Sequence, residues 1–196
     1  MIRRYGVIIE QLLPLALEIC SALHYMAAKG FVHLDVKPRN IVMSAQPRLI
    51  DLSVAMPLAD VHSIERPIGT DAYMAPEQCD PGLFTQIGPA ADVWGLGVTL
   101  FESLMRTRPF PEPRDEPGAP LATRYPQLAA DPPPMFDVPT ELSDIVLSCL
   151  EKSPGDRPTA CDLGEALEPW VSVLPRPRLG LFRPGGRIRS SVFESP

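Results

Sequence analysis

The chain has 196 residues, of which 45% are hydrophobic and 21% are charged, and its formal net charge is −6. This composition excludes a fibrous or fully disordered protein, and the length suits one domain with its own hydrophobic core. No uncharged apolar run reaches the ~18 residues of a membrane-spanning helix, and the N-terminus has no secretory pattern. We therefore expect a soluble, cytoplasmic protein.

Cysteine and proline usage narrows the class further. The four cysteines are scattered and form no C-x-x-C pair, so they predict neither a zinc site nor a disulfide framework. The prolines cluster at 109–139 and 169–196, which marks these stretches as loops or tails. Residues 173–196 hold five arginines and one glutamate. We expect a disordered basic tail; contact with acidic lipid, with nucleic acid or with its own domain is the alternative.

The first predicted element is an amphipathic helix at residues 11–29. Pro14 falls in its first turn, where proline is tolerated, and Gly30 provides the stop. The apolar residues recur at steps of three and four, as expected for a helix with one buried face: Leu12, Leu15, Ile19, Leu23 and Met26.

A polar stretch at residues 33–40, HLDVKPRN, follows the apolar run 31–32. The apolar runs 41–43 and 49–50, with a turn at 44–47 between them, predict a small β-hairpin that ends at Asp51. Because strand ends hold side chains firmly, we expect Asp35, Asn40 and Asp51 to lie close together, where they suit a metal-bound phosphate and a proton acceptor. For Asp35 alone, a turn former or helix cap remains the simpler interpretation.

Residues 51–77 show almost no periodicity and end in GTDAYMAPE at 69–77. An irregular segment of this length inside a domain is usually functional or disordered. An apolar helix follows at 91–105, beginning with DVWGLG at 92–97. Its two glycines each cost roughly 1 kcal/mol against alanine, so we expect close packing against them.

The remaining chain predicts one short helix and two longer ones. The proline-rich region 109–139 can hold at most a short helix near 121–130. Residues 140–168 contain two terminal helices, the first capped by Thr140 and the second by a capping box of Thr159 and Asp162. Pro169 should end the last helix, and Arg157 lies in the loop between the two.

Four motifs in this order resemble the C-terminal lobe (C-lobe) of eukaryotic-type Ser/Thr protein kinases: H-x-D-x-K-x-x-N at 33–40 with the following I-D-L, G-T-x-x-Y-x-A-P-E at 69–77, D-x-W-x-x-G at 92–97, and the late arginine at 157. The resemblance covers residues 12–170 and implies a C-lobe domain at 1–172, mainly α with a small β-hairpin. Small-molecule phosphotransferases share the first motif but do not usually carry the others. The proline- and arginine-rich composition is typical of a bacterial member.

The resemblance also implies a role for each motif residue. Asp35 would accept the proton of a protein Ser or Thr hydroxyl, and Lys37 would steady the γ-phosphate of ATP. Asn40 and Asp51 would hold Mg²⁺. Four further implied residues belong to the activation segment (51–77): Thr70, Ala75, Pro76 and Glu77. Four others would have structural roles: His33, Asp92, Trp94 and Arg157. Asp92 would hold the backbone of the catalytic loop (33–40), and Arg157 would pair with Glu77.

The sequence also departs from the family. It contains no G-x-G-x-x-G and no V-A-I-K, and eleven residues precede Leu12, whereas an N-terminal lobe (N-lobe) sheet needs roughly 40–50. We therefore expect the N-lobe to come from a longer natural chain or a partner chain. Leu34 replaces the usual arginine, so a phosphate on the activation segment would find no charge there. Leu52 and Ser53 replace the last two residues of D-F-G.

Three functions remain open at this point. The first is a Ser/Thr protein kinase that uses ATP and Mg²⁺ on a protein substrate, with no specific nucleic-acid binding. The second is a pseudokinase-like binding module, and the third is a truncated gene product.

Overall fold

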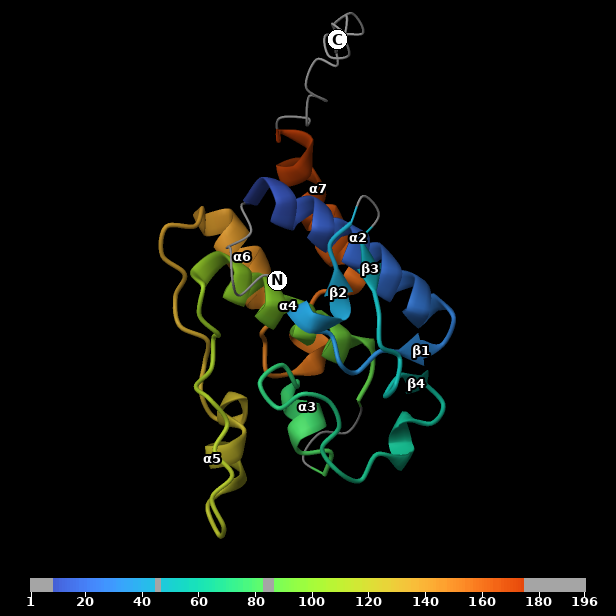
Figure 1. Cartoon of the computed structure of the whole chain (residues 1–196), viewed down its shortest axis with the longest axis vertical. Helices are drawn as coiled ribbons and strands as arrows, with labels where there is room; N and C mark the ends of the chain where they lie inside the picture. The colour runs from blue at the N-terminus through green and yellow to red at the C-terminus, as the bar shows by residue number, and fades with distance from the viewer. Residues whose placement is uncertain (1–8, 45–46, 83–86, 175–196) are drawn as a thin grey trace, which may run out of the picture.

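The computed structural model describes residues 9–44, 47–82 and 87–174, and helices make up about half of this part of the chain (Figure 1). The longer helices are α2 (Ile9–Ala28), α4 (Pro89–Met105), α6 (Thr140–Ser148) and α7 (Ala160–Ser172). The short helical turns are η1 (Pro38–Asn40), η2 (Val61–Ser63), α3 (Pro76–Cys79), α5 (Leu121–Arg124), η3 (Pro126–Leu128) and η4 (Pro154–Asp156). The fold is the α-rich C-lobe type that the sequence predicted. The predicted tail lies outside the described residues, apart from 173–174.

Helix α4 runs through the centre of the molecule, and every residue from Ala91 to Ser103 is buried. Its glycines allow the neighbouring chain to approach closely, as predicted. A Cβ on Gly95 would lie 2.7 Å from the carbonyl oxygen of Val36, and a Cβ on Gly97 would lie 2.6 Å from the Cβ of Cys149. Gly95 therefore lets the catalytic loop touch α4, and Gly97 lets the end of α6 do the same.

Helices α2 and α7 lie side by side and pack with α4 (Figure 1). The apolar residues predicted for the buried face of α2 contribute to the core, apart from Met26, which is only partly buried. No described helix combines the length and apolarity that a bilayer crossing requires.

Three details of the helix ends differ from the predictions. Pro14 lies inside α2 and not in its first turn, because α2 already includes Ile9. Pro169 likewise lies inside α7, which continues to Ser172. Each proline deprives one carbonyl of a partner, those of Glu10 and Glu165; both of these residues are exposed, so water can replace the bond.

The third difference is at Thr140, which is the first helical residue of α6 and not its cap, a position taken by Pro139. The capping box of α7 is confirmed. The backbone N–H of Asp162 donates to Thr159 Oγ1 at 3.2 Å, and the backbone N–H of Thr159 donates to Asp162 Oδ2 at 3.1 Å.

Two antiparallel strand pairs lie beside the helices. β2 (Ile41–Val42) pairs with β3 (Arg48–Leu49), which confirms the predicted hairpin; residues 45–46 of its predicted turn lie outside the described residues. The second pair was not predicted. It joins β1 (Phe31–Val32) to β4 (Met56–Pro57), and so ties the segment after Asp51 to the start of the catalytic loop.

The proline-rich region 109–139 holds α5 and η3, in the place predicted for a short helix. η3 packs against α3, near the end of the activation segment. A small second core forms there from Met74, Cys79 and Tyr125, with Leu128 packed against it. The proline-rich region is thus attached to the activation segment through buried side chains.

Candidate active site

The catalytic loop is anchored to α4 through one carboxylate. Asp92 accepts hydrogen bonds from the backbone N–H of His33 at 2.8 Å and of Leu34 at 2.7 Å. Burial raises the pKa of Asp92 to about 6, although these two bonds favour its ionised form. Leu34 is held at φ 63, a backbone region that costs a non-glycine residue roughly 1–3 kcal/mol. Asp92 therefore fixes a strained turn directly before Asp35.

His33 connects the catalytic loop to the strand that leads to Asp51. Its Nδ1 accepts from the backbone N–H of Asp35 at 3.3 Å, so its Nε2 carries the hydrogen and donates to the carbonyl of Ile50 at 3.2 Å. Burial lowers the pKa of His33, in agreement with a neutral ring that bridges two backbone groups.

Asp35 lies at the centre of a closed set of hydrogen bonds. Thr70 Oγ1 donates to Asp35 Oδ1 at 2.7 Å, and Lys37 Nζ donates to Asp35 Oδ2 at 2.5 Å. Lys37 Nζ also donates to Thr70 Oγ1 at 2.6 Å. Asn40 Nδ2 donates to the backbone carbonyl of Asp35 at 2.9 Å and to its Oδ2 at 3.0 Å. The structure thus brings together a carboxylate, an amine, an amide and a hydroxyl from two distant segments.

Asp51 follows β3 and is exposed, with φ 67. Hydrogen bonds from Ser53 lower the pKa of Asp51, and the backbone N–H of Ser53 lies 3.3 Å from its Oδ1. The residue before it, Ile50, donates its backbone N–H to the carbonyl of Asn40 at 2.8 Å. Asp51 and Asn40 are therefore held in neighbouring segments.

The donor set fits Mg²⁺. The described residues contain no group of three or more His, Cys, Asp or Glu arranged for a metal ion. Mg²⁺ does not need one, because it binds one or two protein oxygens and completes its shell with phosphates and water. Asn40 uses its amide nitrogen on Asp35, which leaves its amide oxygen as a ligand, and Asp51 offers an ionised carboxylate.

The activation segment is held against the catalytic loop by Gln78, which the sequence analysis missed. Gln78 Nε2 donates to the carbonyls of Leu34 at 2.8 Å and Ile68 at 2.9 Å, and its Oε1 accepts from the N–H of Ala75 at 3.0 Å. Gly69, at φ +123, fits here because a Cβ would lie 2.8 Å from the carbonyl of Leu34. The only signal in the sequence was the position of Gln78 directly after A-P-E.

The A-P-E triplet begins α3, with Ala75 at the cap position and Pro76 as the first helical residue, both buried. Glu77 and Arg157 form the ion pair that the resemblance implied. Arg157 Nη1 and Nη2 donate to the two carboxylate oxygens at 2.7 and 2.8 Å, with both side chains fully buried. The guanidinium also lies 4.9 Å from the ring centroid of Trp94.

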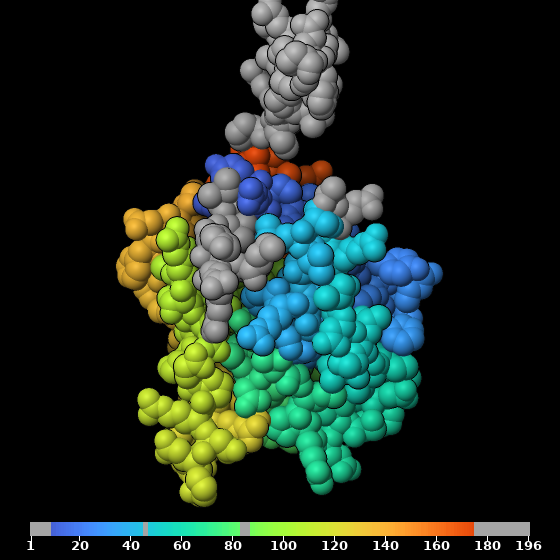
Figure 2. Space-filling view, viewed as in Figure 1, coloured from blue at the N-terminus to red at the C-terminus, as the bar shows by residue number. Residues whose placement is uncertain are grey.

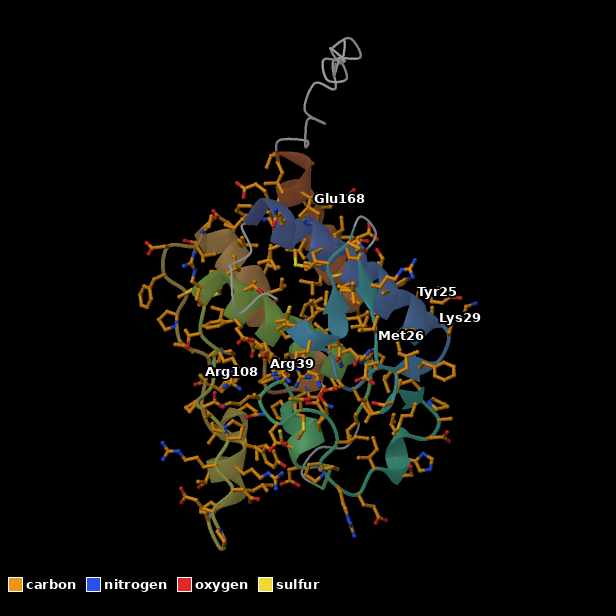
Figure 3. The ribbon with its side chains drawn as sticks, viewed as in Figure 1. Tyr25, Met26, Lys29, Arg39, Arg108 and Glu168 are labelled. Atoms are coloured by element: carbon orange, nitrogen blue, oxygen red, sulfur yellow. The ribbon has the colours of Figure 1, made fainter. Side chains whose placement is uncertain are left out.

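One face of the molecule brings these parts together (Figure 2). The catalytic loop and hairpin (blue to cyan), the activation segment (green) and the start of the proline-rich region (yellow-green) meet there. Arg39, which is labelled in Figure 3, lies on η1 at the centre of this view and is exposed.

The protein kinase domain family matches residues 2–171. Among the similar curated proteins are three bacterial kinases. The probable serine/threonine-protein kinase PkwA of Thermomonospora curvata is 38% identical over 79% of this chain and 20% of its own length. Serine/threonine-protein kinase PkaA of Streptomyces coelicolor is 34% identical over 78% of this chain and 28% of its own length. Serine/threonine-protein kinase PknB of Mycobacterium leprae is 30% identical over 76% of this chain and 24% of its own length.

The aligned part of this chain thus spans about a fifth to somewhat over a quarter of these relatives. The match to the family nevertheless covers nearly the whole chain, and the relatives are named as Ser/Thr kinases. The chain therefore belongs to the protein kinase domain family, among the eukaryotic-type Ser/Thr protein kinases.

Proposed function

We propose that this chain is the catalytic and substrate-binding lobe of a Ser/Thr protein kinase, which transfers the γ-phosphate of ATP to a protein hydroxyl. The observation that supports this most directly is the set of bonds between Asp35, Lys37 and Thr70. It places a carboxylate beside an amine and a hydroxyl on a segment that was expected to receive the substrate.

In this proposal each residue of the site has one task. Asp35 orients the substrate hydroxyl and accepts its proton, which increases the rate by about 10²–10⁴. Lys37, at 2.5 Å from Asp35 Oδ2, neutralises charge on the transferred phosphoryl group. Thr70 holds the activation segment against the catalytic loop. Asn40 and Asp51 would hold Mg²⁺, which supplies charge neutralisation on the nucleotide phosphates.

The surface around Asp51 suits contact with an additional lobe in the active enzyme. Val42, Ile50 and Leu52 are 41%, 42% and 61% exposed, although all three are large apolar residues. Val42 lies in β2 of the hairpin, and Ile50 and Leu52 follow its other strand, β3. Exposed apolar side chains on neighbouring segments mark binding surfaces. We propose that a nucleotide-binding N-lobe covers them, supplied by a longer natural chain or by a partner. The four free cysteines, three of them buried, agree with a cytoplasmic site of action.

The decisive experiment compares Asp35→Asn with the control Asp60→Asn, both made in the form of the protein that includes the N-lobe. Asp60 is also an aspartate and lies within the activation segment, but it is exposed and its side chain makes no capping bond. Phosphate transfer from radiolabelled ATP to a Ser/Thr peptide library should fall by about 10²–10⁴ in the first variant and stay unchanged in the second. Retained transfer in Asp35→Asn would remove the role given to Asp35.

A second candidate function is a pseudokinase-like binding module, which the departures at Leu34, Leu52 and Ser53 favour. Calorimetric titration with Mg-ATP separates the two functions. The test compares the 196-residue chain with the same chain preceded by its upstream reading frame. Binding by the longer form alone supports an N-lobe requirement, whereas binding by neither form supports the binding module.

A further inference from the structure

The proline-rich region donates hydrogen bonds to the activation segment through one buried amide. Gln127 of η3 is 2% exposed. Its Nε2 lies 2.8 Å from the carbonyl oxygen of Asp71 and 3.0 Å from that of Met74, and 3.2 Å from Cys79 Sγ. Three groups of the segment 71–79 thus meet one side chain from a region more than 45 residues away.

A second contact from the same region lies at the surface. Arg124 of α5 donates from Nε to Asp71 Oδ2 at 3.2 Å, and its Nη1 lies 3.6 Å from Asp115 Oδ2. The Arg124 and Asp71 side chains are 41% and 36% exposed, so water and salt screen this pair. Arg124 therefore supports the contact made by Gln127 and is the weaker of the two.

These contacts hold a turn that carries Thr70. The backbone N–H groups of Tyr73 and Met74 both donate to the carbonyl of Thr70, at 2.7 and 3.1 Å. Gln127 binds carbonyls inside this turn and at its end. The side chain of Thr70 in turn donates to Asp35 Oδ1 at 2.7 Å. A continuous series of hydrogen bonds therefore leads from η3 to the catalytic carboxylate.

We propose that Gln127, supported by Arg124, is a positioning residue for the reaction: it holds the turn 70–74 so that Thr70 contacts Asp35. The inference rests on the proposed function, because only that function makes Asp35 the proton acceptor. It gives the proline-rich region a task in substrate binding. Without the amide, the carbonyls of Asp71 and Met74 lose this donor. The turn then keeps its internal bonds and the side-chain bonds of Thr70, Asp71 and Tyr73.

Hydrogen exchange followed by mass spectrometry tests the positioning directly on the 196-residue chain. Gln127→Leu keeps a similar volume and removes the amide. Exchange of the Tyr73 and Met74 amides should rise about tenfold, while exchange within α4 stays unchanged. Unchanged exchange in the turn would overturn the proposal, and an equal rise in α4 would reduce Gln127 to a residue of general stability.

A second variant covers the case in which Gln127→Leu does not fold. Arg124→Gln leaves the buried network intact and should raise exchange in the turn about twofold to threefold. Arg114→Gln is the matched control, because it is the same substitution in the same region and Arg114 is exposed. Equal exchange in the two arginine variants would remove Arg124 from the proposal.

The kinetic test separates this inference from the proposed function. In the active form of the kinase, Gln127→Leu should raise the KM for peptide about tenfold and leave the KM for ATP unchanged. A parallel change in both constants would overturn the positioning role. If the active form transfers no phosphate even without a substitution, the proposed function fails. The exchange data on the 196-residue chain still decide whether Gln127 holds the turn.

Discussion

Replacing Arg157 with methionine should remove a large share of the free energy of unfolding. The guanidinium donates to both oxygens of Glu77 and to the carbonyls of Ala90, Glu151 and Lys152, at distances of 2.7 to 3.0 Å. In the variant, the Glu77 carboxylate would remain buried with no cation beside it. The charge could then be relieved only by taking up a proton or by admitting water.

The magnitude follows from burial. Removing one partner of a buried ion pair costs about 3–5 kcal/mol, because the other charge is left uncompensated. Both side chains of this pair are at 0% exposure, so the upper half of that range applies. Domains are stable by about 5–15 kcal/mol, so Arg157→Met should leave a marginal fold.

Urea unfolding followed by circular dichroism measures the loss. Asp131→Asn is the control. Asp131 pairs with Lys152, and their side chains are 85% and 38% exposed respectively, so this ion pair should contribute less than about 1 kcal/mol. The double variant Glu77→Met, Arg157→Met removes both charges and should be more stable than Arg157→Met alone. A loss below about 1 kcal/mol in Arg157→Met, or a double variant less stable than the single one, would refute this reasoning.

Three further predictions concern stability. Gly97→Ala should cost about 1–3 kcal/mol, because its Cβ would lie 2.6 Å from Cys149, whereas Gly164→Ala meets only contacts of 3.5 Å or more and should stabilise by about 0.4–1 kcal/mol in urea unfolding. Burial lowers the pKa of His33 below its usual 6.5, so the unfolded chain takes up this proton first as the pH falls. Stability should therefore decrease below about pH 6.5 relative to His33→Gln, and parallel curves of unfolding free energy against pH would contradict this. Thr159→Ala should lower the free energy of unfolding by about 1 kcal/mol, because α7 loses its N-terminal cap. Thermal unfolding should show this as a lower midpoint temperature.

The local parts of the site could be predicted because their residues are close in sequence. Asp35, Lys37 and Asn40 lie within one short loop, and Asp51 follows the hairpin that this loop enters. Short spacing and the turn chemistry of the hairpin restrict where such side chains can lie. The predicted β2–β3 pairing is accordingly present, whereas β1–β4 was missed because β4 lies in a segment without periodicity.

The distant partners could not be derived from local patterns. Gln78 and Gln127 are buried amides, and an amide has no periodic signal that distinguishes it from an exposed one. The same limit explains the errors at Pro14 and Pro169, where helix ends were inferred from a local rule and tertiary packing extends the helices past them.

The sequence by itself determined the main helices, the hairpin and the identity of the residues around Asp35, because hydrophobic period and motif spacing act over a few residues. Only the tertiary structure decided which residues far apart in sequence meet. Thr70 donates a hydrogen bond to Asp35, 35 residues away, and Gln127 donates one to Met74, 53 residues away. Arg157 forms a fully buried ion pair with Glu77, 80 residues away. Such contacts are selected by the packing of α3, α4 and η3 together, which no single segment encodes.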